Sequence, residues 1–109
     1  MTESDSPTIR ELTDQIHAMC RAHGWYGDTS PYAQTPRNIA TSVAVEAAEM
    51  LEHFQWGDDY DRDALAGELA DVAMYLFQLA DLVGVDLAQA IEDKIAVNMT
   101  RRWGSEAQK

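Results

Sequence analysis

The chain has 109 residues, with 19 acidic and 8 basic side chains and a formal net charge of −11. This charge argues against nonspecific attraction to a nucleic acid polymer or to an anionic membrane face. It favours a cation as a binding partner. The length allows one domain whose core is only marginally sufficient on its own, so we expect an oligomer.

The composition favours helices and an intracellular setting. Ala and aliphatic residues are abundant, Gly and Pro are scarce, and apolar and polar residues do not alternate regularly. The lone Cys20 cannot form an internal disulfide, and no apolar run approaches the roughly 18 residues of a membrane span. The start, "MTESDSP", lacks the pattern of a secretory signal. We therefore predict an all-α, cytoplasmic protein with no membrane partner.

The predicted domain covers residues 6–104, with a disordered polar tail at 1–5 and a second tail at 105–109. Within the domain we find no internal repeat, low-complexity tract or linker. The residues are therefore predicted to form a single four-helix bundle.

The first predicted helix has two possible starts. Either Ser6 caps it with Pro7 in the first helical position, or Thr8 and Glu11 form a capping box. Gly24 is a plausible stop. The apolar residues between these points recur at helical spacing: Ile9, Leu12, Ile16, Met19 and Cys20.

The segment 24–37, "GWYGDTSPYAQTPR", is predicted to be a loop. It contains the two remaining prolines and three aromatic residues. A loop of this length is uncommon unless it serves a function.

The second predicted helix starts near 36–38 and continues to Gly57, and the third covers about residues 62–83 after the acidic turn "DDYDRD". The third helix has two apolar faces, which a lone surface helix would have to expose. We therefore expect it to be central or to lie at a subunit interface. One face holds Leu65, Leu69, Val72, Leu76 and Leu79, and the other Ala70, Met74 and Phe77.

The fourth predicted helix starts with Asp86 and Gln89 after a break at Gly84, and it runs to about Arg102. One stripe of this helix is apolar at its start and basic at its end, where Lys, Arg and Asn can hold phosphate oxygens. An equally good explanation is that the basic residues interact favourably with the negative C-terminal end of the helix dipole. The stripe is Leu87, Ile91, Lys94, Asn98 and Arg101.

Two acidic pairs occur on successive helices. Glu46 lies three residues before Glu49, and Glu68 lies three residues before Asp71. Residues three apart are neighbours on a helix, and the short turn makes the two helices antiparallel, which can bring all four carboxylates into one cluster. Two like charges about 5 Å apart at an effective dielectric near 20 repel by roughly 3 kcal/mol. Solvent, protons or a divalent cation must therefore relieve the cluster.

The all-oxygen set suits Mg²⁺, or Mn²⁺, better than Zn²⁺. For a single acidic pair, a solvated surface is the better explanation, but two pairs beside apolar faces favour a metal site. A carboxylate-bridged di-iron bundle is an alternative, and it requires Glu-x-x-His on two helices. That motif occurs on neither helix, although His53 follows Glu49 by one turn.

Flat aromatic side chains near such a site could stack on a nucleobase. Trp25 and Trp56 flank the second helix, and Tyr75 follows Asp71 by one turn. For any one of them taken alone, ordinary packing is the better explanation, and we expect Trp103 to pack at the end of the last helix.

The motifs together resemble the MazG-like superfamily of all-α nucleoside triphosphate pyrophosphohydrolases. Its signature is Glu-x-x-Glu, here "VEAAE", about twenty residues before Glu-x-x-Asp, here "GELAD". The segments "PRNIATSVAVEAAEMLEHFQW" and "ELADVAMYLFQLADLVGVDLAQAIEDKIAVNMTRRW" look like the dCTP pyrophosphatase branch, and the likeness covers residues 9–103. The stretch between Trp25 and Pro36 is longer than is usual in that branch.

The resemblance implies a Mg²⁺ site and a nucleotide site built by a homodimer or a tetramer, in which one subunit completes the site of another. The metal ligands and catalytic residues would be Glu46, Glu49, Glu68 and Asp71. Lys94 and Asn98 would hold phosphates, with Arg101 beside them. The residues bordering the nucleotide would be Trp25, Asn38, Trp56 and Tyr75.

The expected activity is hydrolysis of a nucleoside triphosphate, dCTP-like or with a modified pyrimidine, to the monophosphate and pyrophosphate. The resemblance adds a biological role in cleansing the nucleotide pool. A different class, a non-catalytic helical module that binds a basic partner through its acidic surface, stays open on the residues alone.

Overall fold

The computed structural model describes residues 5–101, and the regular structure between them is helical. The four helices are α1 (Ile9–Ala22), α2 (Pro36–Glu52), α3 (Arg62–Leu82) and α4 (Leu87–Thr100). The predicted all-α class with four helices is confirmed. Residues 1–4 of the first predicted tail, the second tail, Arg102 and Trp103 lie outside the described residues.

The helices start at capping residues, as the sequence predicts. Thr8 and Glu11 form the capping box of α1, which decides between its two possible starts. The Asp61 side chain accepts hydrogen bonds from two backbone N–H groups at the start of α3. Asp86 accepts from the backbone N–H of Gln89 at the start of α4. Each cap satisfies N–H groups that have no partner within the helix.

Two predicted helix ends are wrong by a few residues. α2 ends at Glu52 rather than near Gly57, because the backbone tightens there into turns with hydrogen bonds between residues three apart. Gly57 then reverses the chain with a φ of +148°. α4 ends at Thr100 because Arg101 has an extended backbone.

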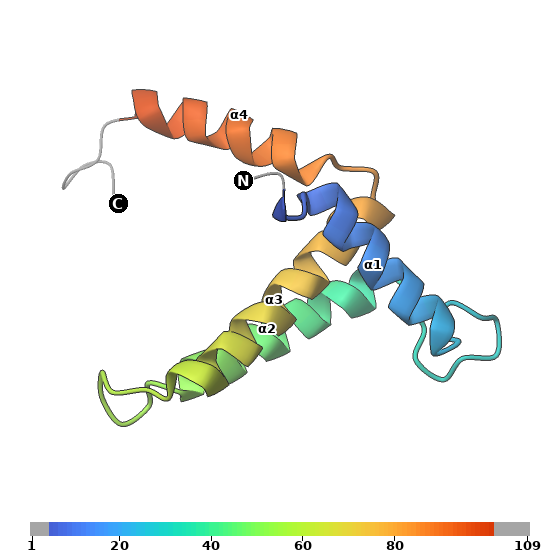
Figure 1. Ribbon diagram of the computed structural model, residues 1–109, viewed down its shortest axis with the longest axis horizontal. Coiled ribbons are helices and arrows are strands. Elements are labelled where there is room, and N and C mark those ends of the chain that lie inside the picture. The colour runs from blue at the N-terminus through green and yellow to red at the C-terminus, as the bar shows by residue number, and fades with distance from the viewer. Residues whose placement is uncertain (1–4, 102–109) are drawn as a thin grey trace.

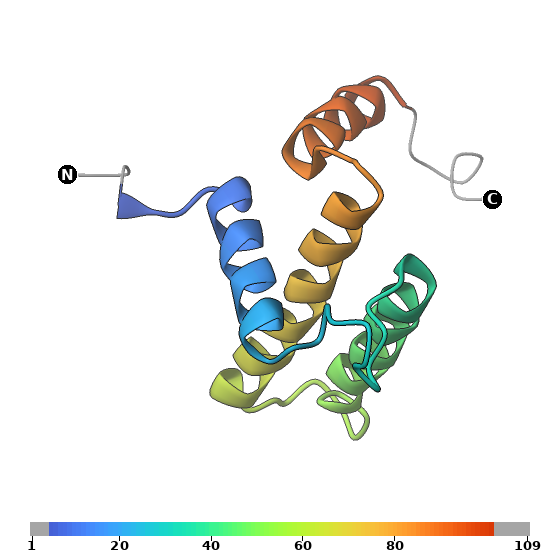
Figure 2. The same ribbon diagram turned by 90° about the vertical axis from the view of Figure 1, so that its right-hand side faces the viewer.

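α3 is the central helix, with α1 and α2 packed against it (Figures 1 and 2). The turn between Glu52 and Arg62 makes α2 and α3 antiparallel neighbours. The central position agrees with the two apolar faces of α3.

The core is small. Among the described residues, the buried apolar side chains are Ile16, Cys20 and Ile39, and the buried polar ones are Thr13 and Gln78. All five come from α1, α2 and α3. A core of this size agrees with the short length, which allows only limited burial within one chain.

α4 turns away from the other helices (Figure 1). Its axis is bent by 101° from that of α3, and it contains no buried residue. Ile95 is 55% exposed and Met99 is 79% exposed. Leu69 and Leu76, from one predicted apolar face of α3, are also exposed. These apolar surfaces have no cover within the described part of the chain.

A search for membrane spans among residues 5–101 finds no single helix that is both long and apolar enough. α3 and α4 would meet the criteria of length and composition only as a pair, across their 101° bend.

Asp81 ties the end of α3 to α1. Arg10 donates to both of its carboxylate oxygens, at 2.9 and 3.2 Å. His17 Nε2 lies 2.7 Å from Asp81 Oδ2. The Arg10 guanidinium first, and then the hydrogen bond with His17, lower the pKa of Asp81 from 3.8 to about 2.

This contact predicts a loss of stability in acid. A lowered folded-state pKa means that the contribution of Asp81 is fully present above its unfolded pKa and is lost as the pH falls from 3.8 to about 2. We expect Asp81→Asn to reduce the difference in free energy of unfolding between pH 7 and pH 2. Urea denaturation at both pH values measures this difference. An unchanged difference would show that the contact adds no stability, and Asp59→Asn, in the exposed acidic turn, serves as the control.

Candidate metal centre and adjoining cleft

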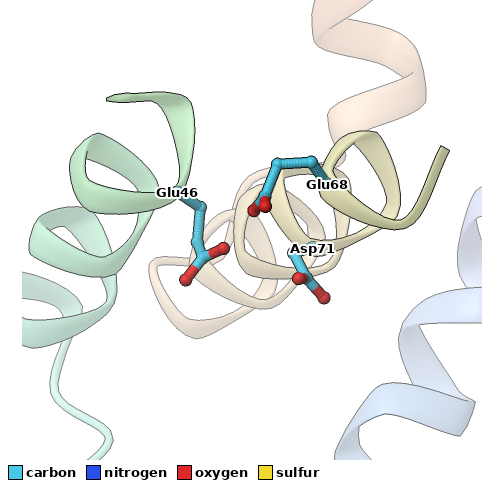
Figure 3. Close-up of side chains that lie close together, drawn as sticks. All are labelled: Glu46, Glu68 and Asp71. Atoms are coloured by element: carbon cyan, nitrogen blue, oxygen red, sulfur yellow. The ribbon is translucent and has the colours of Figure 1, made fainter. Parts of the chain in front are cut away.

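Three carboxylates from α2 and α3 converge. Glu46, Glu68 and Asp71 each offer one oxygen, and these oxygens all lie within 4.8 Å of one another. Figure 3 shows Glu46 reaching from α2 toward Glu68 and Asp71 on α3. The antiparallel packing places the three side chains together, because Glu68 and Asp71 are three residues apart on one face of α3.

The cluster is electrostatically strained without a cation. The pKa of Glu46 is raised to about 7, first by a hydrogen bond with Glu68, then by burial, and then by the negative charges of Glu49, Glu68 and Asp71. The side chain of Glu68 is 17% exposed, and its Oε2 is buried without a hydrogen-bond partner among the described residues. Leaving a buried carboxylate oxygen without a partner costs free energy, and a bound cation would supply the missing partner.

The donor set fits Mg²⁺ or Mn²⁺. Three carboxylates form an all-oxygen site, which a hard divalent ion prefers and Zn²⁺ does not. The His53 Nε2 atom lies 3.8 Å from Glu68 Oε1, at the edge of the group. His53 is not a member of the cluster, so the geometry gives no support to a di-iron site.

Glu49, the fourth predicted ligand, does not join the cluster in this chain. Its side chain is exposed, and it lines a shallow hollow with Glu68 and His53. Its charge still acts on Glu46. The expectation that all four carboxylates converge is therefore met by three of them, with Glu49 beside the group.

A cleft of about 600 Å³ adjoins the cluster. Asp71 belongs to both, and Tyr75 lies one turn further along α3 in the cleft wall. Burial first, and then the negative charges of Glu46 and Asp71, raise the pKa of Tyr75. The cleft therefore connects the acidic group to a mainly apolar space large enough for a nucleoside.

Two other predicted nucleotide-bordering residues also line the cleft. Trp25 is half-buried there, and its ring stacks on His23 with 4.7 Å between the centroids. Asn38 lies at the start of α2, and its Nδ2 donates to the carbonyl oxygen of Ala33, which holds the loop against the helix. The structure thus gathers Trp25, Asn38 and Tyr75 around one space.

Trp56 does not line the cleft within one chain. It lies in the turn after α2 and is 92% exposed. Packing within the described residues does not explain so exposed a tryptophan, and its predicted place beside a nucleotide is not met within one chain.

The phosphate-binding residues predicted on α4 also lie away from the cluster. From Asp71 to the end of α3 at Leu82 the helix rises about 16 Å, and α4 then bends away (Figure 1). Lys94 and Arg101 are exposed, and Asn98 accepts a 3.5 Å hydrogen bond from Arg101. The expectation that this basic end meets the carboxylates is therefore wrong for a single chain.

Sequence reasoning missed three polar residues of the site: Gln34 and Gln78 line the cleft, and His17 hydrogen-bonds Tyr26 nearby. The helical spacing did indicate Gln78. It lies four residues after Met74 and three after Tyr75, on the face of the helix that starts at Asp71. Gln78 is the polar residue between the two apolar faces predicted for this helix, one of which contains the neighbouring residues Met74 and Phe77.

Residues 41–109 match the MazG-like family, and this segment includes both acidic pairs. The chain belongs to that family. The resemblance seen in the sequence is thereby confirmed.

Three relatives illustrate the similarity. Mouse dCTP pyrophosphatase 1 is 34% identical over 108 residues, which cover 90% of this chain and 61% of the mouse protein. The dATP/dGTP diphosphohydrolase of cyanophage S-2L is 47% identical over 96 residues, covering 88% of this chain and 78% of the phage protein. The crystal structure of a pyrophosphatase from Archaeoglobus fulgidus aligns with a TM-score of 0.69 and 29% identity, covering 85% of this chain and 90% of the other.

The chain spans about three fifths of the length of the mammalian dCTP pyrophosphatases that it matches. Its relatives also differ in the bases that their names give, cytosine in one group and adenine or guanine in the other.

Proposed function

We propose that the protein is a Mg²⁺-dependent nucleoside triphosphate pyrophosphohydrolase that releases pyrophosphate and the nucleoside monophosphate. The observation that carries this proposal is the convergence of Glu46, Glu68 and Asp71 beside a cleft of nucleoside size. Membership of the MazG-like family supports the same reaction. The substrate class is a deoxynucleotide with a dCTP-like or modified base, consistent with a role in cleansing the nucleotide pool.

The carboxylate cluster would hold the metal, with Glu49 as the fourth carboxylate of the site. When bound, a divalent ion polarises phosphate oxygens and lowers the pKa of water. Glu46, Glu68 and Asp71 would hold that ion beside the cleft. A carboxylate that is not committed to the ion accepts the proton of the attacking water. The exposed position of Glu49 beside the cluster suits it to this role.

A second copy of the chain would complete the site, as a homodimer or a tetramer. The uncovered apolar side chains of α3 and α4, among them Leu69, Ile95 and Met99, support this proposal, because a partner subunit could bury them. The α4 of one subunit would bring Lys94, Asn98 and Arg101 to the leaving pyrophosphate of another.

The cleft would hold the nucleoside between aromatic walls. Trp25 and Tyr75 offer flat surfaces to a base or sugar, and the partner's turn would add the exposed Trp56. The intracellular nucleotide pool is the expected place of action.

An activity panel tests the proposed reaction. Purified protein is incubated with Mg²⁺ and, separately, dCTP, dUTP, dTTP, dATP and dGTP, and pyrophosphate and orthophosphate are both measured. We expect pyrophosphate without orthophosphate from at least one nucleotide. No hydrolysis of any of them would leave the non-catalytic interaction module as the better explanation of the acidic surface.

Metal removal gives a further prediction that needs no substrate. A ligand that binds only the folded state stabilises it, by about 2.7 kcal/mol at 100 times its dissociation constant. We expect excess Mg²⁺ to raise the melting temperature of the EDTA-treated protein by several degrees, and we expect K⁺ at matched ionic strength not to do so. Differential scanning calorimetry measures both. Equal shifts with the two cations would show screening of the net charge rather than a site.

A further inference from the structure

Gln78 is a buried polar side chain in the wall of the cleft, 2% exposed. We propose that it selects the nucleobase: its amide oxygen accepts a hydrogen bond from the exocyclic amino group of cytosine or adenine. Uracil, thymine and guanine carry an oxo group at the equivalent position, which cannot donate. The inference rests on the proposed function, because it assumes that the base of a nucleoside triphosphate occupies the cleft.

The position of Gln78 along α3 suits this role. It lies seven residues after Asp71, which is two helical turns on the same face and a rise of about 10 Å. Asp71 belongs to the carboxylate cluster, and Tyr75 lies between the two in the cleft wall. A nucleotide whose phosphates lie at the cluster would therefore extend its base toward Gln78.

The loop fixes the orientation of the Gln78 amide from one side. The Gln34 Nε2 atom donates to the backbone carbonyl oxygen of Tyr32 at 2.7 Å. A carbonyl oxygen can only accept, so the nitrogen of Gln34 must face it and its Oε1 must face Gln78. The Gln78 Nε2 atom donates to that oxygen at 2.9 Å.

α1 and the loop contact the same amide from the other side. Asp81 is a carboxylate held by Arg10, so His17 Nε2 carries the hydrogen in their 2.7 Å contact. His17 Nδ1 hydrogen-bonds the hydroxyl of Tyr26. The Tyr26 oxygen accepts from Gln78 Nε2 at 3.1 Å.

Both hydrogens of the Gln78 nitrogen are thereby committed, and the amide oxygen is the group left to accept from a ligand. The bond from Gln34 to a backbone carbonyl oxygen, which can only accept, sets this orientation. Gln78 therefore offers an acceptor, and an amino group on the base satisfies it. An oxo group would place two acceptors against each other and leave a buried polar group unpaired.

His17, Tyr26, Gln34 and Asp81 are positioning residues in this scheme. They hold Gln78 from α1, from the 24–35 loop and from the end of α3. The loop that is longer than usual in the dCTP pyrophosphatase branch thus supplies two of the groups that set base preference.

Matched substrate pairs test the inference on the unaltered protein. dCTP and dUTP differ at one exocyclic group, as do dATP and deoxyinosine triphosphate. We expect kcat/KM to favour the amino member of at least one pair by about 10- to 100-fold. Ratios near one in both pairs, or a preference for the oxo member, would overturn the inference while leaving the hydrolysis itself established. No hydrolysis of any substrate would instead contradict the proposed function.

The variant Gln78→Leu tests whether this residue carries the preference. We expect the amino-to-oxo ratio to fall about 10-fold, through a higher KM for the amino-bearing nucleotide and little change for its oxo counterpart. A purely structural role would lower kcat/KM for all four substrates equally, and a retained ratio would equally overturn the assignment. If Gln78→Leu does not melt cooperatively, Gln78→Met, which keeps an unbranched side chain of similar length, replaces it. Gln15→Leu, on the exposed face of α1, is the matched control.

Discussion

Glu68→Gln is expected to abolish pyrophosphate release and yet leave the metal-free protein at least as stable as before. The substitution removes a ligand of the metal site that we propose, and losing such electrostatic stabilisation costs about 10²- to 10³-fold in kcat. It also removes a charge from a cluster in which three carboxylate oxygens lie within 4.8 Å. Two like charges at about 5 Å repel by roughly 3 kcal/mol, so relief of this repulsion opposes unfolding.

The measurement combines an activity assay with thermal denaturation in EDTA at pH 8, where Glu46 has released its shared proton. We expect a melting temperature that is unchanged or a few degrees higher, together with the loss of the rise caused by Mg²⁺. The control is Asp59→Asn, which removes an exposed charge from the turn before α3. A large fall in melting temperature would show that Glu68 is a structural residue and would contradict the assignment of the site.

Ile95→Asp is expected to dissociate the oligomer that we propose and to remove activity with it. Ile95 is 55% exposed on α4, a helix with no buried residue. If a second copy covers this face, a carboxylate placed there must be buried without a partner, which costs several kcal/mol. We expect a mass near that of the 12.2 kDa chain and a loss of activity of about 10-fold or more.

Analytical ultracentrifugation at micromolar concentration measures the mass, and pyrophosphate release is measured on the same sample. Gln15→Asp introduces the same charge on the outer face of α1 and should change neither result. An Ile95→Asp protein that stays assembled and active would place the interface elsewhere. An unaltered protein that sediments as a monomer and is fully active would show that one chain builds the whole site.

The local features of the fold could be predicted from the sequence because each depends on neighbouring residues. Thr8, Asp61 and Asp86 cap helices through contacts with residues two or three positions along the chain. Three of the four paired carboxylates meet because a short turn makes α2 and α3 antiparallel. Both inferences use only helical periodicity and loop length, which can be read directly from the sequence.

The features that depend on distant or external contacts were not predicted correctly. The direction of α4 is set by the bend after Gly84. The apolar stripe of this helix indicated that it is buried, but not which surface covers it. Within one chain α4 turns away from α2 and α3, so the predicted meeting of its basic end with the carboxylates is not found there. Likewise, Gln78 has no local partner, and its role depends on Gln34 and Tyr26, which are 44 and 52 residues away.

In the assembly that we propose, the outward path of α4 would make catalysis subject to mass action. If the cations that neutralise the departing pyrophosphate come from another molecule, a freshly diluted chain can bind metal but cannot turn over. Specific activity would then rise with enzyme concentration until assembly is complete. A cell that holds few copies would leave its own triphosphates intact, and hydrolysis would begin only above a threshold abundance.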